Sequence, residues 1–167
     1  MALVIETGSS SISSNSYVTV EECKAYASLR GFTLPSTDPE IEVLIIKAND
    51  YLESLTFKGE KTDSSQALEF PREGLVISGD ELSSDTIPEK LKQAQCRLAF
   101  EAVSTDLLPT GNGREVLREK VDVLEVQYAE KGTSVDKPTF TSVDSLLKDF
   151  ISGASTRTGA ALKTLRV

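Results

Sequence analysis

The chain has 167 residues, which is enough for one domain with a hydrophobic core and few for two. Only 39% of the residues are hydrophobic, below the roughly 45–50% of ordinary globular domains, so part of the chain is expected to lie outside the core. The net charge is −8; residues 153–167 carry three basic and no acidic side chains, which leaves −11 for residues 1–152. An acidic body argues against general affinity for nucleic acids, because Lys and Arg at phosphates supply most of that affinity.

The sequence lacks the residue types that several kinds of chemistry need. Histidine, the commonest general base and neutral metal ligand, is absent. Glycine-rich phosphate-binding motifs and Cys-x-x-Cys pairs are also absent. The two cysteines, Cys23 and Cys96, fall in expected amphipathic helices and are predicted to be free, buried and reduced. We therefore predict a protein that is not an enzyme and that uses no cofactor or metal.

No targeting or membrane segment is expected either. The longest apolar runs fall well short of the ~20 residues that a transmembrane helix needs. The N-terminus lacks a basic stretch followed by a hydrophobic run, so it does not read as a secretory signal. Residues 1–16 are instead predicted to form a flexible N-terminal arm, because Ser and Gly dominate residues 7–16 and such a segment buries little apolar surface.

Three helices are predicted before residue 110. Thr19 and Glu22 have the spacing of a capping box, and Gly31 marks the end of that first helix. Asp38 and Pro39 are expected to begin the second helix, as its cap and first residue. The third should run between Thr86 and Pro109, with Thr86 and Glu89 as another capping box. The second and third helices should pack together through a core of five residues: Leu44, Ile45, Leu52, Leu91 and Leu98.

Residues 57–85 show no sustained period but contain Leu68 and Phe70, so we expect an ordered loop laid over the helices. Within it, Phe70, Pro71 and Arg72 are predicted to be a structural anchor. Phe70 should fill a pocket on the helical body, and Pro71 should fix the turn. Arg72 should form a bidentate pair with a carboxylate of its own body or of a neighbour, and an exposed loop arginine is the open alternative.

The remainder of the chain is expected to combine one extended element with one helix. Leu124, Val126 and Tyr128 alternate with polar residues, which predicts a β-hairpin or extended arm at about 114–130. Ser142 is expected to cap a short helix that ends at Gly153. The predicted fold is thus mainly α: a small helical bundle at 17–152 with a long ordered loop, the hairpin or arm, and flexible terminal segments, including the basic C-terminal tail at 153–167.

Several of these segments, in this order, resemble a family of tailed-bacteriophage head-to-tail adaptor proteins, also called connector or head-completion proteins. Many of its members are labelled DnaT-like single-stranded-DNA-binding proteins. The matching segments are NSYVTVEECKAYASLRG at 15–31, KANDYLESLTFKG at 47–59, QALEFPREG at 66–74, IPEKLKQAQCRLAFEA at 87–102 and EKVDVLEVQY at 119–128. Phe70 stands where the family usually has Trp, and Asp122 where it usually has Gly.

The resemblance implies a mainly helical structural protein of the virion neck, made in the cytoplasm of a bacterial host. Its copies would form a homo-oligomeric ring beneath the portal protein, with the twelve copies (a dodecamer) that are usual in this family. The ring would join the DNA-filled head to the next head-completion or tail protein, a stopper or tail terminator. DNA would pass through its channel without specific binding, and no membrane would be involved.

Two further expectations concern partners. The basic tail is expected to dock on an acidic surface of the portal, with Arg157, Lys163, Leu165 and Arg166 as its contacts. Much of the acidic charge of the body is expected to face the channel, where it repels phosphate, with the acids near 38–42 or 60–85 as candidates. The alternative function is a single-stranded-DNA-binding module. Such a module needs a basic groove with aromatic side chains on which bases stack.

Overall fold

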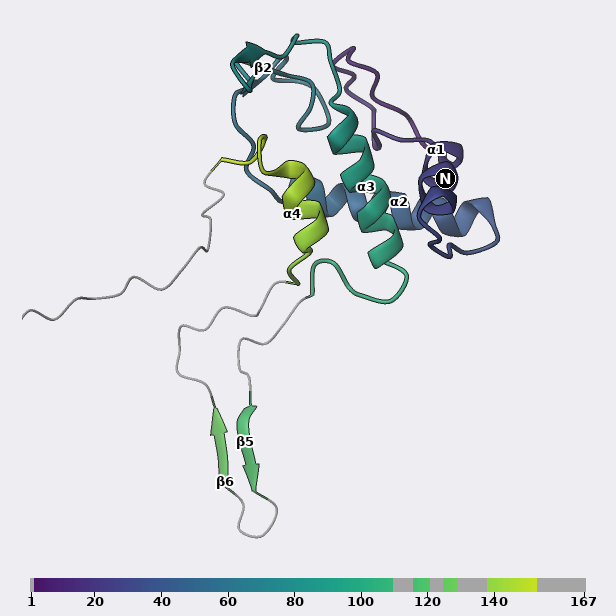
Figure 1. Cartoon of the computed structure of the whole chain (residues 1–167), viewed down its shortest axis with the longest axis vertical. Helices are drawn as coiled ribbons and strands as arrows, with labels where there is room; N and C mark the ends of the chain where they lie inside the picture. The colour runs from purple at the N-terminus through teal and green to yellow at the C-terminus, as the bar shows by residue number, and fades with distance from the viewer. Residues whose placement is uncertain (1, 110–115, 121–124, 129–137, 153–167) are drawn as a thin grey trace, which may run out of the picture.

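The computed structural model describes residues 2–109, 116–120, 125–128 and 138–152. Four helices surround one core, and three two-stranded antiparallel sheets lie outside it (Figure 1). The helices are α1 (Val20–Leu29), α2 (Asp38–Glu53), α3 (Glu89–Glu101) and α4 (Thr141–Leu147). The sheets pair β1 (Glu60–Lys61) with β2 (Arg72–Glu73), β3 (Val76–Ile77) with β4 (Asp80–Glu81), and β5 (Val116–Lys120) with β6 (Glu125–Tyr128).

Helix α1 begins and ends where the sequence predicts. The Thr19 hydroxyl accepts a hydrogen bond from the Glu22 amide at 3.1 Å, and the Thr19 amide donates to the Glu22 carboxylate at 2.8 Å. This reciprocal pair is the predicted capping box. At the other end, Gly31 adopts φ +68°, a left-handed conformation that costs glycine little, and the chain turns away from the helix.

Helix α3 is shorter than predicted at both ends. Its N-cap is Pro88, and no capping box forms between Thr86 and Glu89 because the Thr86 hydroxyl contacts Asp85 instead. The helix ends at Glu101, well before Pro109, and the following turn is closed by a bond from the Leu108 amide to the Asp106 carboxylate. The N-caps of two other helices also differ from the predicted residues. The N-cap of α2 is Thr37 rather than Asp38, and the N-cap of α4 is Phe140 rather than Ser142.

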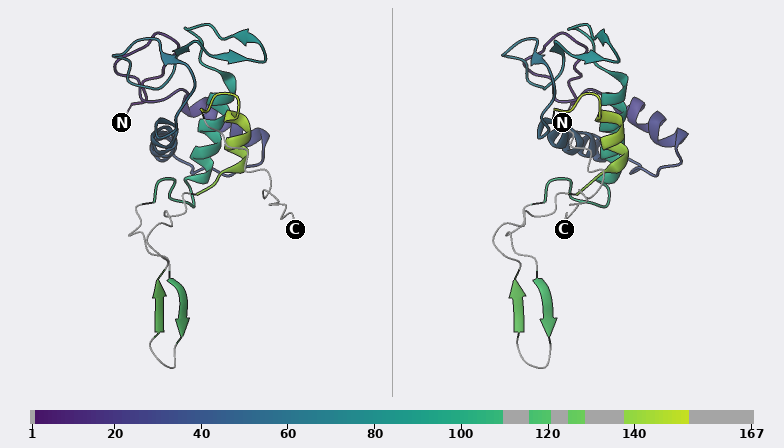
Figure 2. Two further views of the ribbon diagram at one scale, coloured as in Figure 1. Left: turned by 90° about the vertical axis from the view of Figure 1, so that its left-hand side faces the viewer. Right: turned by 60° about the vertical axis from the view of Figure 1, so that its left-hand side comes forward.

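Helix α3 is the central element of the core. It contacts α1, α2 and α4, and all three views place it between the other helices (Figures 1 and 2). Its buried positions include small residues, Ala94 and Ala99, which allow close approach of the neighbouring helices. The five residues expected to form the core between α2 and α3 are all buried: Leu44, Ile45, Leu52, Leu91 and Leu98.

The segment expected to be a flexible N-terminal arm is a hydrogen-bonded loop over residues 2–16. Its centre is Glu6, whose side chain is buried. The Glu6 carboxylate accepts bonds from the amides of Gly8, Ser9 and Ser11 and from the Ser14 hydroxyl. These bonds lower the pKa of Glu6, although burial acts in the opposite direction. The loop is ordered by one buried charge rather than by apolar burial, which is why hydrophobicity alone did not predict it.

Residues 57–85 form the expected ordered loop, with Leu68, Phe70 and Leu75 buried against the helices. The loop also contains two of the short sheets, β1–β2 and β3–β4. The prediction of a mainly α fold is therefore met only in part: the described residues form a helical core with small antiparallel sheets. The expected hairpin at about 114–130 corresponds to β5 and β6. The tail at 153–167 lies outside the described residues.

The position of Leu98 in this core gives a stability test. Leu98 is fully buried between helices, so Leu98→Ala should lower the free energy of unfolding by about 2–5 kcal/mol in a denaturant titration. Leu29→Ala is the matched control, because Leu29 is 84% exposed and its truncation should change stability by less than about 0.5 kcal/mol. Equal effects of the two substitutions would contradict the assignment of Leu98 to the core.

Candidate functional surfaces

Phe70 is the point at which the long loop is fixed to the helical body. Its ring is fully buried and makes edge-to-face contacts with Tyr17, Phe57 and Phe150, at centroid distances of 6.4, 5.0 and 6.3 Å. The Phe70 amide donates to the Tyr17 hydroxyl, which in turn donates to the Glu53 carboxylate. Burial raises the pKa of Glu53. One aromatic side chain therefore joins segments from four parts of the chain.

Arg72 stabilises the same loop through hydrogen bonds to its backbone carbonyls. Its Nε donates to the Lys58 carbonyl at 2.8 Å, and its two terminal nitrogens reach the carbonyls of Gly59 and Glu69. Only one of these nitrogens contacts a carboxylate, that of Glu69, at 2.6 Å. The predicted bidentate carboxylate pair is therefore not formed, because the backbone carbonyls of the loop occupy the other donors. Arg72 is 7% exposed, which also excludes an exposed loop arginine.

Pro71 completes the anchor. It is buried and follows a cis peptide bond. Its carbonyl accepts a hydrogen bond from the side-chain amide of Gln66, which is itself buried. The three anchor residues thus bind the chain to itself and leave almost none of their side-chain surface for a ligand.

A partly exposed cluster of aromatic and arginine side chains lies where α1 and α3 end. Phe32 and Phe100 stack at 4.3 Å between ring centroids, and the Arg97 guanidinium lies 4.5 Å from the Phe32 centroid. Beside them, the Arg30 guanidinium lies 3.7 Å from the Tyr26 centroid. This arrangement of aromatic rings with cations is the chemistry that binds nucleobases by stacking. Sequence periodicity does not identify the cluster, because Phe32 lies outside any periodic segment.

The electrostatics around this aromatic–arginine cluster are close to neutral. Arg97 pairs with Glu101 at 2.5 Å, and Lys92 lies 3.7 Å from Glu22. A groove of about 330 Å³ runs between α1 and α3 next to the cluster and is lined by both Lys92 and Glu22. The positive charges are therefore balanced by acids of the same surface, and the groove has no net basic lining.

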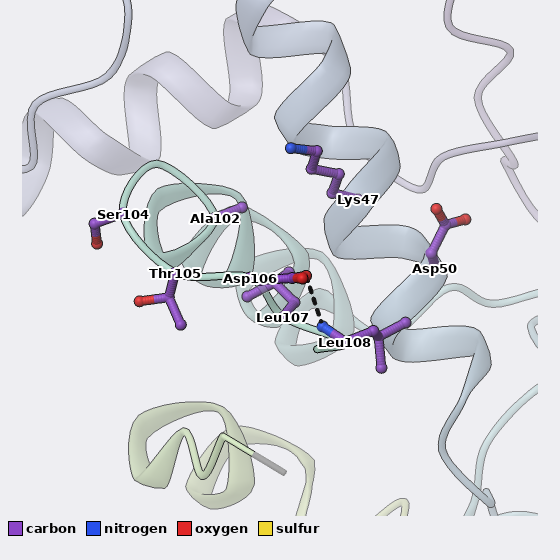
Figure 3. Close-up of a pocket in the computed structure, with 8 residues that line it drawn as sticks. All are labelled: Lys47, Asp50, Ala102, Ser104, Thr105, Asp106, Leu107 and Leu108. Atoms are coloured by element: carbon purple, nitrogen blue, oxygen red, sulfur yellow. Dashed lines mark hydrogen bonds between the residues drawn. The ribbon is translucent and has the colours of Figure 1, made fainter. Parts of the chain in front are cut away.

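The outer face of α2 carries an apolar groove. Val43, at 55% exposure, and Ile46 line it together with Leu3 of the N-terminal loop. A second and larger hollow, about 580 Å³, begins at Lys47 on the same helix and continues to Leu108 (Figure 3). Lys47 lines both hollows.

Strands β5 and β6 form a ribbon that stands apart from this body. In the described part of the chain the two strands contact each other and no other helix or strand. Figures 1 and 2 show the ribbon beyond the end of the helical body in every view. An isolated two-stranded hairpin is at best marginally stable in water, so this element needs a surface to pack on.

The other features considered in the sequence analysis do not contribute to a candidate binding surface among the described residues. Cys23 and Cys96 are free and buried, and a hydrogen bond to Cys23 together with burial raises the pKa of Cys96. Within the described residues no group of His, Cys, Asp or Glu side chains could hold a metal ion, and no helix is long and apolar enough to cross a membrane. The expected portal contacts lie outside the described residues: Arg157, Lys163, Leu165 and Arg166.

These features define a small domain with a helical core, a firmly anchored loop and a ribbon that, among the described residues, contacts no other helix or strand. The chain belongs to the family described as "Putative DnaT-like ssDNA binding protein", whose model matches residues 1–167. No curated protein and no solved structure matched the chain.

The anchoring role of Arg72 can be tested by its closest substitute. Arg72→Lys should lower the free energy of unfolding by roughly 2–4 kcal/mol, because a lysine cannot satisfy carbonyls on two sides at once and leaves buried acceptors unpaired. Arg30→Lys serves as the control: Arg30 is exposed, so its substitution should cost less than about 0.5 kcal/mol. If Arg72→Lys unfolded at the same urea concentration as the wild-type chain, the contacts of Arg72 with the carbonyls would contribute little to stability.

Proposed function

We propose that the chain is a head-to-tail adaptor of a tailed bacteriophage, a structural protein whose copies form a ring beneath the portal. The ring would join the DNA-filled head to the following stopper or tail-terminator protein and continue the DNA channel. Twelve copies are usual in the adaptor family that the sequence resembles. The observation that carries the proposal is the β5–β6 ribbon, which contacts no other helix or strand in the described part of its own chain.

The ribbon supports assembly for a physical reason. Each edge of a two-stranded ribbon leaves backbone groups without a partner, and both faces are open unless another surface covers them. A chain that carries such an element beside a well-packed core gains stability when copies associate. The low apolar fraction of the sequence agrees with this, because surface that a monomer would bury inside can instead be buried between subunits.

The charge distribution supports the same function. DNA must pass through a neck channel without being held, and an acidic lining repels phosphate. Residues 1–152 carry a net −11, which suits a channel wall better than a binding groove. The tail at 153–167 carries +3 and is assigned to an acidic surface of the portal, with Arg157, Lys163, Leu165 and Arg166 as its contacts.

Binding of single-stranded DNA is the second candidate function. The family description names it, and the aromatic–arginine cluster of Tyr26, Arg30, Phe32, Arg97 and Phe100 has suitable residue types. Two observations weigh against it. The Phe32 and Phe100 rings already stack on each other, and Arg97 is already paired with Glu101, so bases would have to displace existing contacts. The body is also acidic, which opposes binding to phosphates.

Two measurements, the mass of the assembled oligomer and the binding of single-stranded DNA, distinguish the two functions. The purified chain mixed with portal protein should give a ring in native mass spectrometry. Fluorescence anisotropy with a labelled thymidine oligonucleotide of about 30 nucleotides, near 0.1 M salt, should show no saturable binding. Salt-sensitive binding that Phe100→Ala weakens, with Phe140→Ala as a control at a buried aromatic ring, would favour the second function. A chain that stays monomeric with portal would contradict the first.

The assignment of the tail has its own test. Deletion of residues 154–167 should leave the thermal midpoint of the body unchanged, because the core of the described residues is complete without this segment. It should lower affinity for the portal, since three basic side chains are lost. Charge reversal at Arg157, Lys163 and Arg166 in the full-length chain is the matched variant. If the truncated adaptor joins DNA-filled heads to tails at the wild-type yield, the tail is not a portal contact.

A further inference from the structure

We infer that Cys23 and Cys96 are an oxidisable pair of thiols, which a small hydroperoxide such as hydrogen peroxide converts into a disulfide between α1 and α3. The chain contains no other cysteine, so an intrachain disulfide can form only between these two. The inference concerns the folded body and does not depend on the proposed ring. The link is absent in a reducing cytoplasm and forms in an oxidising medium.

The fold brings the two thiols together. Cys23 lies on α1 and Cys96 on α3, far apart in the sequence, and the two helices pack against each other. Both thiols are free and buried, and their side chains share a hydrogen bond. A disulfide requires the sulfur atoms to approach to about 2.0 Å, with the Cβ atoms close to each other. Hydrogen-bonded thiols on two packed helices start near that arrangement.

The hydrogen bond distinguishes the sulfur that ionises first from the sulfur that keeps its proton. It lowers the pKa of Cys23, although burial acts in the opposite direction. The same hydrogen bond and burial raise the pKa of Cys96. Thiolates rather than thiols attack oxidants, so the first proton lost from the pair prepares Cys23 for reaction. Cys96 is then placed beside it as the resolving thiol.

A groove gives a small oxidant a route to the pair. Cys96 lines the groove of about 330 Å³ between α1 and α3 and is 4% exposed, whereas Cys23 has no exposed surface. Hydrogen peroxide is small enough to enter beside Cys96. A tripeptide such as glutathione is not, because so little of the cysteine surface is open. The geometry therefore favours a small hydroperoxide over a bulky disulfide as the oxidant.

The reaction with peroxide balances in atoms and electrons. The Cys23 thiolate attacks one peroxide oxygen: an S–O bond forms, the O–O bond breaks, and the departing hydroxide takes up a proton to become water. The Cys96 sulfur then attacks the sulfur of the sulfenic acid, which forms the S–S bond, breaks the S–O bond and releases a second water. The two thiols lose two electrons and two protons in all, and one peroxide is reduced to two waters.

The disulfide would strengthen the attachment of α1 to the body. The buried residues of α1 are Val20, Cys23 and Ala27, which bury less apolar surface than the leucines of α2 and α3. A link between Cys23 and Cys96 closes a long segment of the chain and restricts the unfolded state, which favours the folded one. The oxidised chain should therefore unfold at a higher urea concentration than the reduced chain.

Oxidation of the purified full-length chain, without portal protein, tests the inference. The reduced chain treated with stoichiometric hydrogen peroxide near neutral pH should lose both free thiols and the mass of two hydrogen atoms. It should remain a monomer under non-reducing denaturing conditions, and peptide mapping should join the segments that contain Cys23 and Cys96. The urea midpoint should rise, and dithiothreitol should restore it. Oxidised glutathione at the same concentration should react at least about tenfold more slowly.

Cys23→Ala and Cys96→Ala are the matched variants, because alanine keeps the site apolar and removes one sulfur. Peroxide should raise the urea midpoint of neither variant, and the wild-type measurements decide the inference even where a variant folds poorly. Thiols that stay free under peroxide, disulfide-linked dimers, a disulfide that forms only in urea, or equal rates with oxidised glutathione would each overturn it. None of these outcomes bears on the proposed ring, since portal protein is absent from the experiment.

Discussion

The burial of Arg72 is the constraint on which the long loop depends. A guanidinium cannot lose its charge in a protein, so its donors must be satisfied wherever it is buried. Here the carbonyls of Lys58, Gly59 and Glu69 converge on it, and the Glu69 carboxylate supplies the opposite charge. These carbonyls belong to two stretches that are not neighbours in sequence. The loop therefore closes around Arg72, and Phe70, two residues earlier, is placed in the aromatic pocket of the body.

Much of the helical core could be predicted from periodicity, because the apolar residues of α2 and α3 repeat at three- and four-residue steps and bury one face. The ends of helices were less predictable. Thr86 and Glu89 have the spacing of a capping box, yet Asp85 competes for the threonine hydroxyl and the helix begins after Pro88. A sequence pattern identifies groups that could cap a helix. The tertiary position of the chain decides which of them do.

Polar features were the least predictable. Glu6 organises the N-terminal loop through bonds to three amides and a hydroxyl, but nothing in a Ser-rich sequence distinguishes an organising carboxylate from a solvated one. The same applies to the aromatic–arginine cluster. Tyr26 and Arg30 are one helical turn apart and could be paired from sequence, whereas Phe32 and Phe100 meet only because α1 and α3 pack together. Contacts of that kind are set by the fold and leave no local pattern.

The contrast between the body and the ribbon bears on how the chain works. The body is held by its own contacts: the leucines that face the core are buried, the loop is closed around a guanidinium, and Arg97 of the aromatic–arginine cluster pairs with Glu101. Within the described residues, the ribbon contacts no other helix or strand and is held by the pairing of its two strands. A folded body that leaves one element without a partner can remain stable alone and still gain free energy on association. In the proposed neck ring, this dependence would tie stable joining to the presence of a neighbouring subunit.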